Sequence, residues 1–297
     1  MAETIILDKE LIAGFEPQRH EDGHKNTFGQ ALICAGSGFM TGAAVMATGA
    51  ALRTGVGLVK VFSEEKTLSA VSITEPCALL EDRPENTAEL LRKADKLCRK
   101  VNSVLIGSGI PQDYKDMEAL TSLFITKAQN VVLDAGALTD KPDVLGRLTE
   151  MLKAREVPAV LTPHIGEFAR LTRLTNSEVQ QNAEELAAKF AQDNNVVVVL
   201  KSAKTLIAVP DGKLYVNDCP NSGLAKGGSG DVLAGLLTGF LAQGMEPYKA
   251  ACSAVYIHSK AGEAASNEVG VRSMLPSDLI AYLPGAYMDA GWGCDDD

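Results

Sequence analysis

The chain has 297 residues, of which 46% are hydrophobic and 22% charged, a balance that can bury a large core. Its net charge of -10 argues against nucleic-acid binding, so anionic ligands must be held by backbone N–H groups and a few lysines. The six cysteines are scattered without a C-x-x-C pair, which argues against a zinc site or a disulfide framework. No signal-peptide pattern opens the chain, and its longest apolar stretch, 232–242, is too short to span a bilayer. These features predict a soluble, cytoplasmic protein without membrane association.

Short runs of aliphatic and β-branched residues alternate with helical patterns along the chain. We predict buried strands over residues 31–35, 58–62, 104–107, 130–134, 158–162 and 196–201. Helices are predicted over 42–54, 177–193, 230–243 and 247–266, and a hairpin turn at 210–212 joins strands over 205–209 and 213–216. This order predicts one α/β domain over residues 1–297, with a doubly wound, mostly parallel sheet, helices on both faces and an acidic tail over 293–297. In such sheets ligands bind beyond the carboxyl ends of the strands.

The most informative segment is 223–231, with the sequence GLAKGGSGD, directly before an apolar helix. Glycines let backbone N–H groups approach an anion, and a helix N-terminus adds a favourable dipole. We therefore predict a phosphate loop formed by Gly227, Gly228, Ser229 and Gly230. Asp231 in the first helical turn would be the base for a hydroxyl that attacks phosphorus. The alternative is a glycine-rich turn whose Asp only favours the helix start, and the Walker pattern is absent.

Two further loops follow predicted strands. His164 is a candidate for ligand contact, and Glu167 is a candidate for holding magnesium through water. The alternative for this loop is a plain helix start with an acidic first turn. Lys201 ends the most buried strand, where it must reach solvent or pair with an anion. That anion is either part of a nucleotide or a nearby carboxylate.

Weaker signals lie in three other segments. The glycine-lined stretches 36–38 and 107–109 would let a bulky ligand approach the backbone. Asp134 ends a strand at the same edge and is a candidate metal or phosphate-side carboxylate. His258 lies in an apolar helix and is interpreted as structural.

Taken in chain order, these motifs resemble one family. The segments AGS, LDAGAL, LTPH-x-GEF, VVLK and N-x-GLAKGGSGDVLAG are similar to the ADP-dependent NAD(P)H-hydrate dehydratase family, which has a ribokinase-like fold. The resemblance covers a core of about residues 25–283 and corresponds to the carboxy-terminal half of the bifunctional bacterial repair enzyme. The glycine-rich motif is shared with the wider superfamily, including hydroxyethylthiazole kinase, whereas LTPH-x-GE and LDAGAL are more specific.

The resemblance implies an activity and a set of site residues. ADP would phosphorylate the C6 hydroxyl of the S form of hydrated NAD(P)H, and elimination would give NAD(P)H, AMP and phosphate. The hydrated dinucleotides NADHX and NADPHX would contact Ala44, Gly109, His164 and Asp231. The adenine nucleotide would contact Lys201, Ser202, Ala203, Lys204, Thr205 and Gly230. The resemblance also implies magnesium, a homotetramer and a functional partnership with an NAD(P)H-hydrate epimerase.

The chain departs from the family pattern at several positions. Asn26, Ser108, Ser202, Ser229 and the pair Cys219-Pro220 stand where other residues are usual, and Ser202 and Pro220 affect the expected nucleotide pocket. Two alternatives remain open. One is an ATP-dependent kinase of the same superfamily acting on a thiazole or pyrimidine alcohol. The other is a nucleotide-binding protein without turnover, against which the intact Gly230-Asp231 argues.

Overall fold

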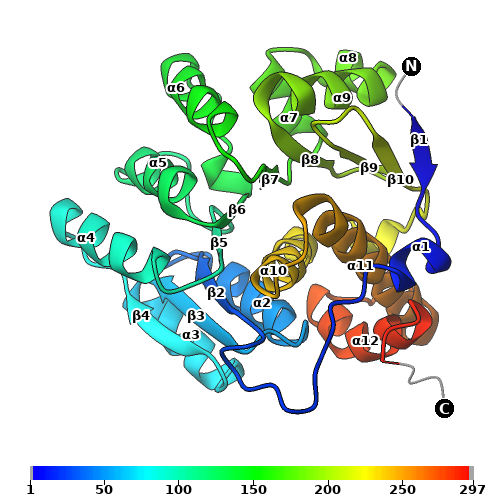
Figure 1. Cartoon of the computed structure of the whole chain (residues 1–297), viewed down its shortest axis with the longest axis horizontal. Helices are drawn as coiled ribbons and strands as arrows, with labels where there is room; N and C mark the ends of the chain where they lie inside the picture. Colours follow the sequence, from blue (N-terminus) through cyan, green and yellow to red (C-terminus); the bar gives the residue numbers. More distant parts are fainter. Residues whose placement is uncertain (1–2, 294–297) are drawn as a thin grey trace.

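A single ten-stranded sheet organises the computed structural model, which describes residues 3–293 (Figure 1). Across the sheet the strands are β1 (Thr4–Ile6), β10 (Leu214–Asn217), β9 (Thr205–Ala208), β8 (Val196–Leu200), β7 (Ala159–Leu161), β6 (Asn130–Leu133), β5 (Ser103–Ile106), β2 (Gln30–Cys34), β3 (Leu58–Ser63) and β4 (Leu79–Asp82). Only β9 runs antiparallel to its neighbours. The predicted doubly wound, mostly parallel sheet is confirmed. Of the predicted tail, all but Gly293 lies outside the described residues.

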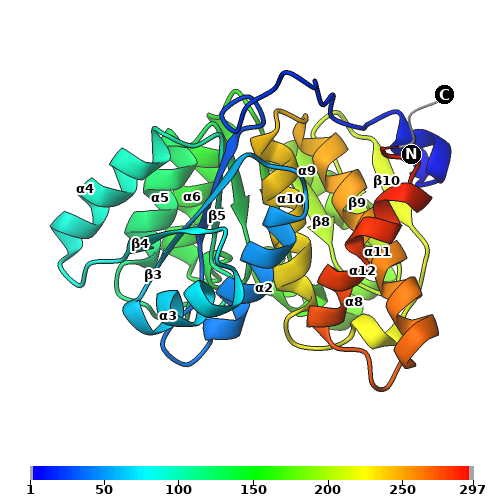
Figure 2. The same ribbon diagram turned by 90° about the horizontal axis from the view of Figure 1, so that it is seen from below.

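Helices cover both faces of the sheet (Figures 1 and 2). One face is covered by α2 (Thr41–Leu52), α3 (Glu65–Thr74), α10 (Ser229–Ala242), α11 (Pro247–Val269) and α12 (Pro276–Asp289). The other is covered by α4 (Thr87–Cys98), α5 (Met117–Lys127), α6 (Pro142–Lys153), α7 (Ile165–Thr172), α8 (Asn176–Gln181) and α9 (Ala183–Asn194). Successive strand residues alternate between the two cores: in β2, Ile33 packs into the first and Leu32 into the second. No helix within residues 3–293 is long and apolar enough to cross a membrane.

One predicted helix differs from the structure, and several elements, among them β4 and α3 to α6, were not predicted from the sequence. The helix predicted over 177–193 is two helices, because the chain leaves helical geometry at Asn182, with φ -126° and ψ 28°. The Asn182 amide donates to the Glu178 carbonyl at 3.1 Å, a local bond that competes with the helical pattern. Segments outside the core of about residues 25–283 pack onto the same sheet: β1 pairs with β10, α1 (Lys9–Ala13) follows it, and the buried Trp292 indole donates to the Ile12 carbonyl at 2.8 Å.

The chain order reverses between β2 and β5, which are neighbours in the sheet. From this point β3 and β4 continue to one side, and β6, β7 and β8 to the other. Loops after adjacent strands on either side of such a switch point diverge and leave a crevice for ligands. The loops after β2 and β5 are the glycine-lined segments 36–38 and 107–109.

Candidate active site

Asp134 is the centre of a buried hydrogen-bond cluster at the carboxyl edge of the sheet. It follows β6, and its side chain is 3% exposed. Its Oδ2 accepts from the Ser108 hydroxyl at 2.7 Å, and its Oδ1 accepts from the Thr162 hydroxyl at 2.7 Å and from Lys201 Nζ at 3.1 Å. These partners come from the loops after β5 and β7 and from the end of β8, so one carboxylate connects four adjacent strand ends.

Lys201 connects this cluster to the glycine-rich loop. Its backbone N–H donates to the Pro163 carbonyl at 2.8 Å, and Lys201 forms an isolated parallel bridge with His164. A side chain at Gly230 would place its Cβ 3.3 Å from Lys201 Nζ. Burial alone would lower the pKa of Lys201, but the charges of Asp134 and Glu167 outweigh it and the pKa is raised. Of the two partners left open for Lys201, the nearby carboxylate is present at 3.1 Å, and the ammonium also lies beside the N-terminus of α10.

The glycine-rich loop ends at the first turn of α10, as predicted. Gly228 caps this helix with φ 108°, a conformation that favours glycine. A Cβ at Gly227 would meet no atom within 4 Å, so the backbone there is open to a ligand. Lys226 does not point toward an anion, because its ammonium donates to the carbonyls of Arg272 and Met274. The anion-binding capacity of this loop thus comes from backbone N–H groups and Lys201.

Asp231 lies in the first turn of α10, as expected. Burial and the nearby negative charge of Asp134 raise the pKa of the Asp231 carboxyl to about 7, against the lowering effect of Lys201 and the Ser108 hydroxyl. A carboxylate with this pKa holds and releases a proton near neutral pH, which is the property of a general base.

His164 and Glu167 form the start of α7. His164 Nδ1 accepts from the N–H groups of Gly166 at 3.0 Å and Glu167 at 3.3 Å, and Glu167 Oε2 accepts from the His164 N–H at 2.8 Å. This reciprocal capping box confirms the alternative interpretation of the segment as a helix start. The His164 side chain is still 56% exposed at the carboxyl edge, and its Nε2 lies 3.5 Å from Glu167 Oε1.

The carboxylates at this edge do not form a metal site by themselves, and they fit magnesium only when the ion is bound to a nucleotide. No group of three or more His, Cys, Asp or Glu side chains among residues 3–293 is arranged to hold a metal ion. Magnesium in nucleotide sites keeps several waters and binds mainly phosphate oxygens, with one or two carboxylates. Glu167, with Oε2 engaged by a single N–H, fits a contact through water.

The segment after β8 contributes Ser202, Ala203 and Lys204, with Leu206, to the lining of a groove of about 660 Å³. The Ser202 hydroxyl donates to the Lys204 carbonyl and the Thr205 hydroxyl to the Ser202 carbonyl, which closes a tight turn after β8. Ile165 and residues 180–185 form the rest of the lining. Lys204 pairs with Glu184 at 2.9 Å across it. This groove lies next to Lys201 and His164, and its size suits a nucleoside moiety.

Ala44 and Gly109 lie together on the other side of Asp134. Gly109 has φ 65°, and a Cβ there would lie 2.5 Å from the Ala43 Cβ, so only glycine fits against the first turn of α2. Ala44 is fully buried, with its methyl close to Gly36. The Gly36 N–H donates to the Ser108 carbonyl at 2.8 Å. Of the predicted dinucleotide contacts, Ala44 and Gly109 therefore lie together, His164 lies apart from them beside Lys201, and Ala44 is fully buried and presents no surface to a ligand.

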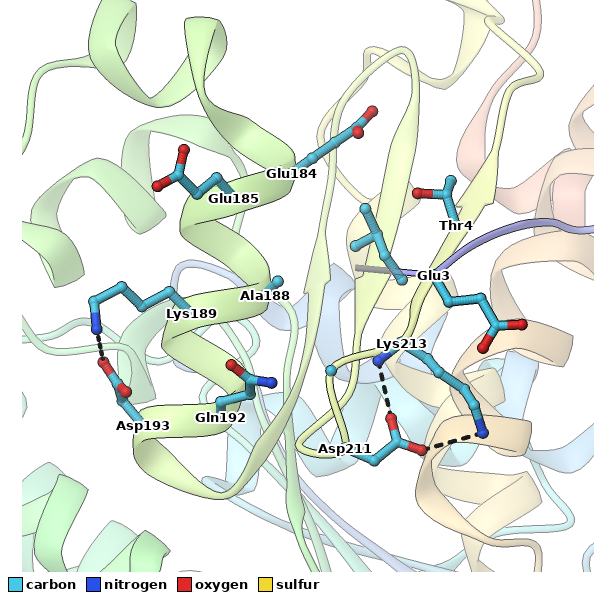
Figure 3. Close-up of a pocket in the computed structure, with 12 residues that line it drawn as sticks. Glu3, Thr4, Glu184, Glu185, Ala188, Lys189, Gln192, Asp193, Asp211 and Lys213 are labelled. Carbon is cyan, nitrogen blue, oxygen red and sulfur yellow. Dashed lines mark hydrogen bonds and ion pairs between the residues drawn. The ribbon is translucent and has the colours of Figure 1, made fainter. Parts of the chain in front are cut away.

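A larger groove, of about 980 Å³, lies elsewhere (Figure 3). It runs between α9 and the β9–β10 turn, and Ala208 opposite Val198 places that turn toward the amino ends of the strands. Its two lysines are paired with aspartates, Lys189 with Asp193 at 2.8 Å and Lys213 with Asp211 at 3.3 Å. The other charged residues of the lining, Glu3, Glu184 and Glu185, are all acidic, which disfavours an anionic nucleotide. We refer to it as the amino-edge groove.

Two residues of the site, Ser108 and Thr162, were not identified from the sequence, whereas His258 was correctly interpreted as structural. The hydroxyls of Ser108 and Thr162 were not identified as partners of Asp134, because single hydroxyls carry no pattern. His258 is buried, its Nε2 lies 3.0 Å from the Ser229 carbonyl, and burial lowers its pKa to about 4. It is a neutral structural histidine that supports the first turn of α10.

The sheet order and the glycine-capped α10 with its acidic first turn define a ribokinase-like α/β protein. A ribokinase-like superfamily protein from Enterococcus faecalis superposes with a TM-score of 0.78 at 25% identity, over 97% of this chain and 96% of that one. The Carb_kinase family, described as NAD(P)H-hydrate dehydratase, matches residues 31–285. The chain belongs to this NAD(P)H-hydrate dehydratase family.

Individual relatives agree with this assignment. The ADP-dependent (S)-NAD(P)H-hydrate dehydratase of Bacillus subtilis is 34% identical over 93% of this chain and 95% of its own length. A crystal structure of the ADP/ATP-dependent NAD(P)H-hydrate dehydratase from B. subtilis, co-crystallised with ATP and Mg²⁺, superposes with a TM-score of 0.86 at 32% identity, over 96% and 98% of the chains. The bifunctional NAD(P)H-hydrate repair enzyme Nnr of Moorella thermoacetica is 36% identical over 90% of this chain. The chain spans about half, 51%, of that longer relative.

Proposed function

We propose that this protein is an ADP-dependent (S)-NAD(P)H-hydrate dehydratase, a carbon–oxygen hydro-lyase that repairs NADHX and NADPHX. The observation that carries the proposal is Asp231, with a pKa raised to about 7, beside the backbone N–H groups of the phosphate loop and Lys201. The names of the relatives over nearly the whole chain support the substrate assignment.

The chemistry follows from leaving-group ability. Hydroxide leaves a ring carbon poorly, whereas phosphate leaves readily. Asp231 takes the proton of the C6 hydroxyl, the hydroxyl oxygen bonds to the terminal phosphorus of ADP, and the bond between that phosphorus and the AMP oxygen breaks. Cleavage of the C6–O bond, with loss of a proton from the neighbouring ring carbon, then gives NAD(P)H and inorganic phosphate.

The remaining site residues bind the two substrates and stabilise the charge on the transferred phosphoryl group. The N–H groups of Gly227, Gly228, Ser229 and Gly230, with Lys201, stabilise charge on the transferred phosphoryl group. Residues 201–205 and the groove beside them hold the adenine nucleotide, and Gly109 and His164 hold the dinucleotide. Magnesium, when bound with the nucleotide near Glu167, neutralises phosphate charge.

A coupled assay tests this function. Hydrated NADH or NADPH with ADP and magnesium should regain the near-ultraviolet absorbance of reduced nicotinamide and release AMP and phosphate in equal amounts. Running ADP and ATP side by side determines the nucleotide preference. No recovery, together with nucleotide consumption on a thiazole or pyrimidine alcohol, would support the kinase alternative. Nucleotide binding without any turnover would support the binding-protein alternative.

A further set of proposals concerns the oligomeric state, the cellular location and the partner of the protein. We propose a cytoplasmic homotetramer that works with an NAD(P)H-hydrate epimerase. The existence of bifunctional repair enzymes about twice as long as this chain supports coupling to a second repair activity. Light scattering on the purified protein measures the oligomeric state, and addition of a separate epimerase should increase the fraction of a mixed hydrate that is repaired.

A further inference from the structure

The structure contains a buried arginine that the proposed chemistry does not use. Arg83 directly follows β4, and its side chain is 1% exposed. Its Nη2 donates to Glu64 Oε1 at 2.8 Å and to the Gly36 carbonyl at 3.2 Å. Its Nε and Nη1 are buried without a hydrogen-bond partner. A buried guanidinium with one carboxylate partner and unpaired donors is costly, so a purely stabilising role does not explain it.

Arg83 joins three segments of the carboxyl edge. The first is the loop 36–38 after β2, through the Gly36 carbonyl. The second is Glu64 after β3, whose Oε2 accepts from the Gly38 N–H at 2.9 Å. The third is the segment after β5, because the Arg83 guanidinium lies 4.9 Å from the centre of the Tyr114 ring. The pair of Arg83 and Glu64 thus holds the loop 36–38 from both of its ends.

This loop contacts Gly109, which is proposed to bind the dinucleotide. A Cβ at Gly109 would lie 3.3 Å from the Gly36 Cα, and the Ala44 methyl lies beside Gly36. A displacement of the loop 36–38 therefore changes the surface at Gly109. Asp231 is held by α10 and Lys201 by Asp134, and the loop 36–38 meets this cluster through the Gly36 N–H, which donates to the Ser108 carbonyl at 2.8 Å.

We propose that Arg83 and Glu64 are positioning residues that hold the loop 36–38 in the conformation that binds the dinucleotide substrate. This inference rests on the proposed function and names the residues that set its substrate affinity. Neither residue touches the reacting atoms. Their loss weakens binding of the dinucleotide and leaves phosphoryl transfer from ADP largely unchanged.

The test compares Glu64→Gln with Glu65→Gln, an exposed neighbour outside the pair. Glu64→Gln keeps the side-chain shape and removes the charge that pairs with Arg83. We expect the KM for the hydrated dinucleotide to rise about 10-fold, the size of one lost charge-assisted hydrogen bond. The kcat and the KM for ADP should stay within about twofold, and Glu65→Gln should match the wild type. Arg83→Met should give a larger rise in the same KM, and Arg83→Lys should recover part of it.

Direct binding of NADH and NADPH, measured by calorimetry, separates this inference from the proposed function. A wild type that binds them without turnover contradicts the proposed function, and weaker binding by Glu64→Gln still supports the positioning role. Equal affinity of wild type and a folded Glu64→Gln overturns that role. A fall in kcat of Glu64→Gln at unchanged KM also overturns the positioning role, as does a parallel rise in its KM values for both substrates. A wild type that binds neither dinucleotide overturns both proposals. Because Glu64 is partly exposed, its variant should fold even if Arg83→Met does not.

Discussion

Both edges of the sheet carry charged side chains, but they arrange them in opposite ways. At the carboxyl edge the buried Asp134 carboxylate accepts hydrogen bonds from two hydroxyls and from Lys201. Its negative charge also contributes to the raised pKa of the nearby Asp231. In the amino-edge groove the lysines pair with aspartates that are more than half exposed, 55% for Asp193 and 58% for Asp211. The amino-edge groove is the more voluminous of the two, at about 980 Å³ against about 660 Å³.

The difference shows that desolvation, rather than volume, turns charged residues into a reactive site. Charges in water interact weakly, and exposed ion pairs contribute little to stability. Burial strengthens the same interactions and disfavours the charged form of an acid, which contributes to the raised pKa of Asp231. The comparison predicts that substitutions at the carboxyl edge change activity strongly, and that matched substitutions in the amino-edge groove do not.

The largest effect is expected for Asp231→Asn. Removing the base should lower kcat for hydrate repair by about 10²- to 10⁴-fold, because general-base catalysis has this magnitude. ADP affinity, measured by calorimetry, should stay near that of the wild type. Asp211→Asn in the amino-edge groove is the matched control and should leave kcat unchanged. Activity of Asp231→Asn above a tenth of wild type would remove Asp231 from the role of base.

The next effect is expected for Lys201→Met. Loss of the ammonium beside the α10 N-terminus should weaken ADP binding by about 10- to 100-fold, the range of a charge-assisted hydrogen bond. Lys213→Met, in the amino-edge groove, should bind ADP like the wild type. Titration calorimetry on both variants measures the difference. Equal affinities for the two variants would place the nucleotide elsewhere.

The comparison can also be tested through pH. Because the pKa of Asp231 is about 7, kcat/KM should fall about tenfold per pH unit below 7, where the carboxyl is protonated. Lys201 lowers this pKa, so Lys201→Met should move the acid limb to higher pH. A pH-independent kcat/KM between 5 and 8 in the wild type would contradict the assignment.

The same raised pKa has a consequence for stability. A carboxyl with a raised folded-state pKa contributes stability that is fully present below its unfolded pKa, about 4, and is lost as the pH rises through about 7. The Tm of the wild type should therefore decline relative to that of Asp231→Asn between about pH 4 and pH 7, and the difference should level off above pH 7. Parallel Tm profiles for the two proteins would show that Asp231 titrates at its ordinary pKa.

The smallest effect is expected at Glu184, which lines both grooves and pairs with Lys204. Glu184→Gln frees Lys204 for the nucleotide, so the KM for ADP should fall about two- to threefold. Its effect on unfolding free energy should be below about 1 kcal/mol, because the pair is exposed. Glu185→Gln, which has no such partner, is the control. A raised KM for ADP in Glu184→Gln would mean that the ion pair itself shapes the nucleotide site.

Much of the fold could be predicted from the sequence because strand periodicity and helix-start signals are local. The strands β2, β3, β5, β6, β7 and β8 and the start of α10 correspond to predicted segments within a few residues. The site cluster could not be predicted, because Ser108 and Thr162 reach Asp134 only through the order of strands in the sheet, across 26 and 28 residues. The burial of Arg83 could not be predicted either, because Arg83 lies in a charged stretch, EDRPEN, that is typical of an exposed loop.

The most direct test of the central claim follows the oxygen of the C6 hydroxyl. The hydrated dinucleotide is prepared with a heavy oxygen isotope in that hydroxyl and is repaired with ADP and magnesium, and the phosphate is analysed by mass spectrometry. If Asp231 activates the hydroxyl for phosphorylation, the labelled oxygen appears in inorganic phosphate, one atom for each NADH or NADPH formed. Labelled oxygen released into water, with unlabelled phosphate, would show that the hydroxyl leaves without phosphorylation and would contradict the account.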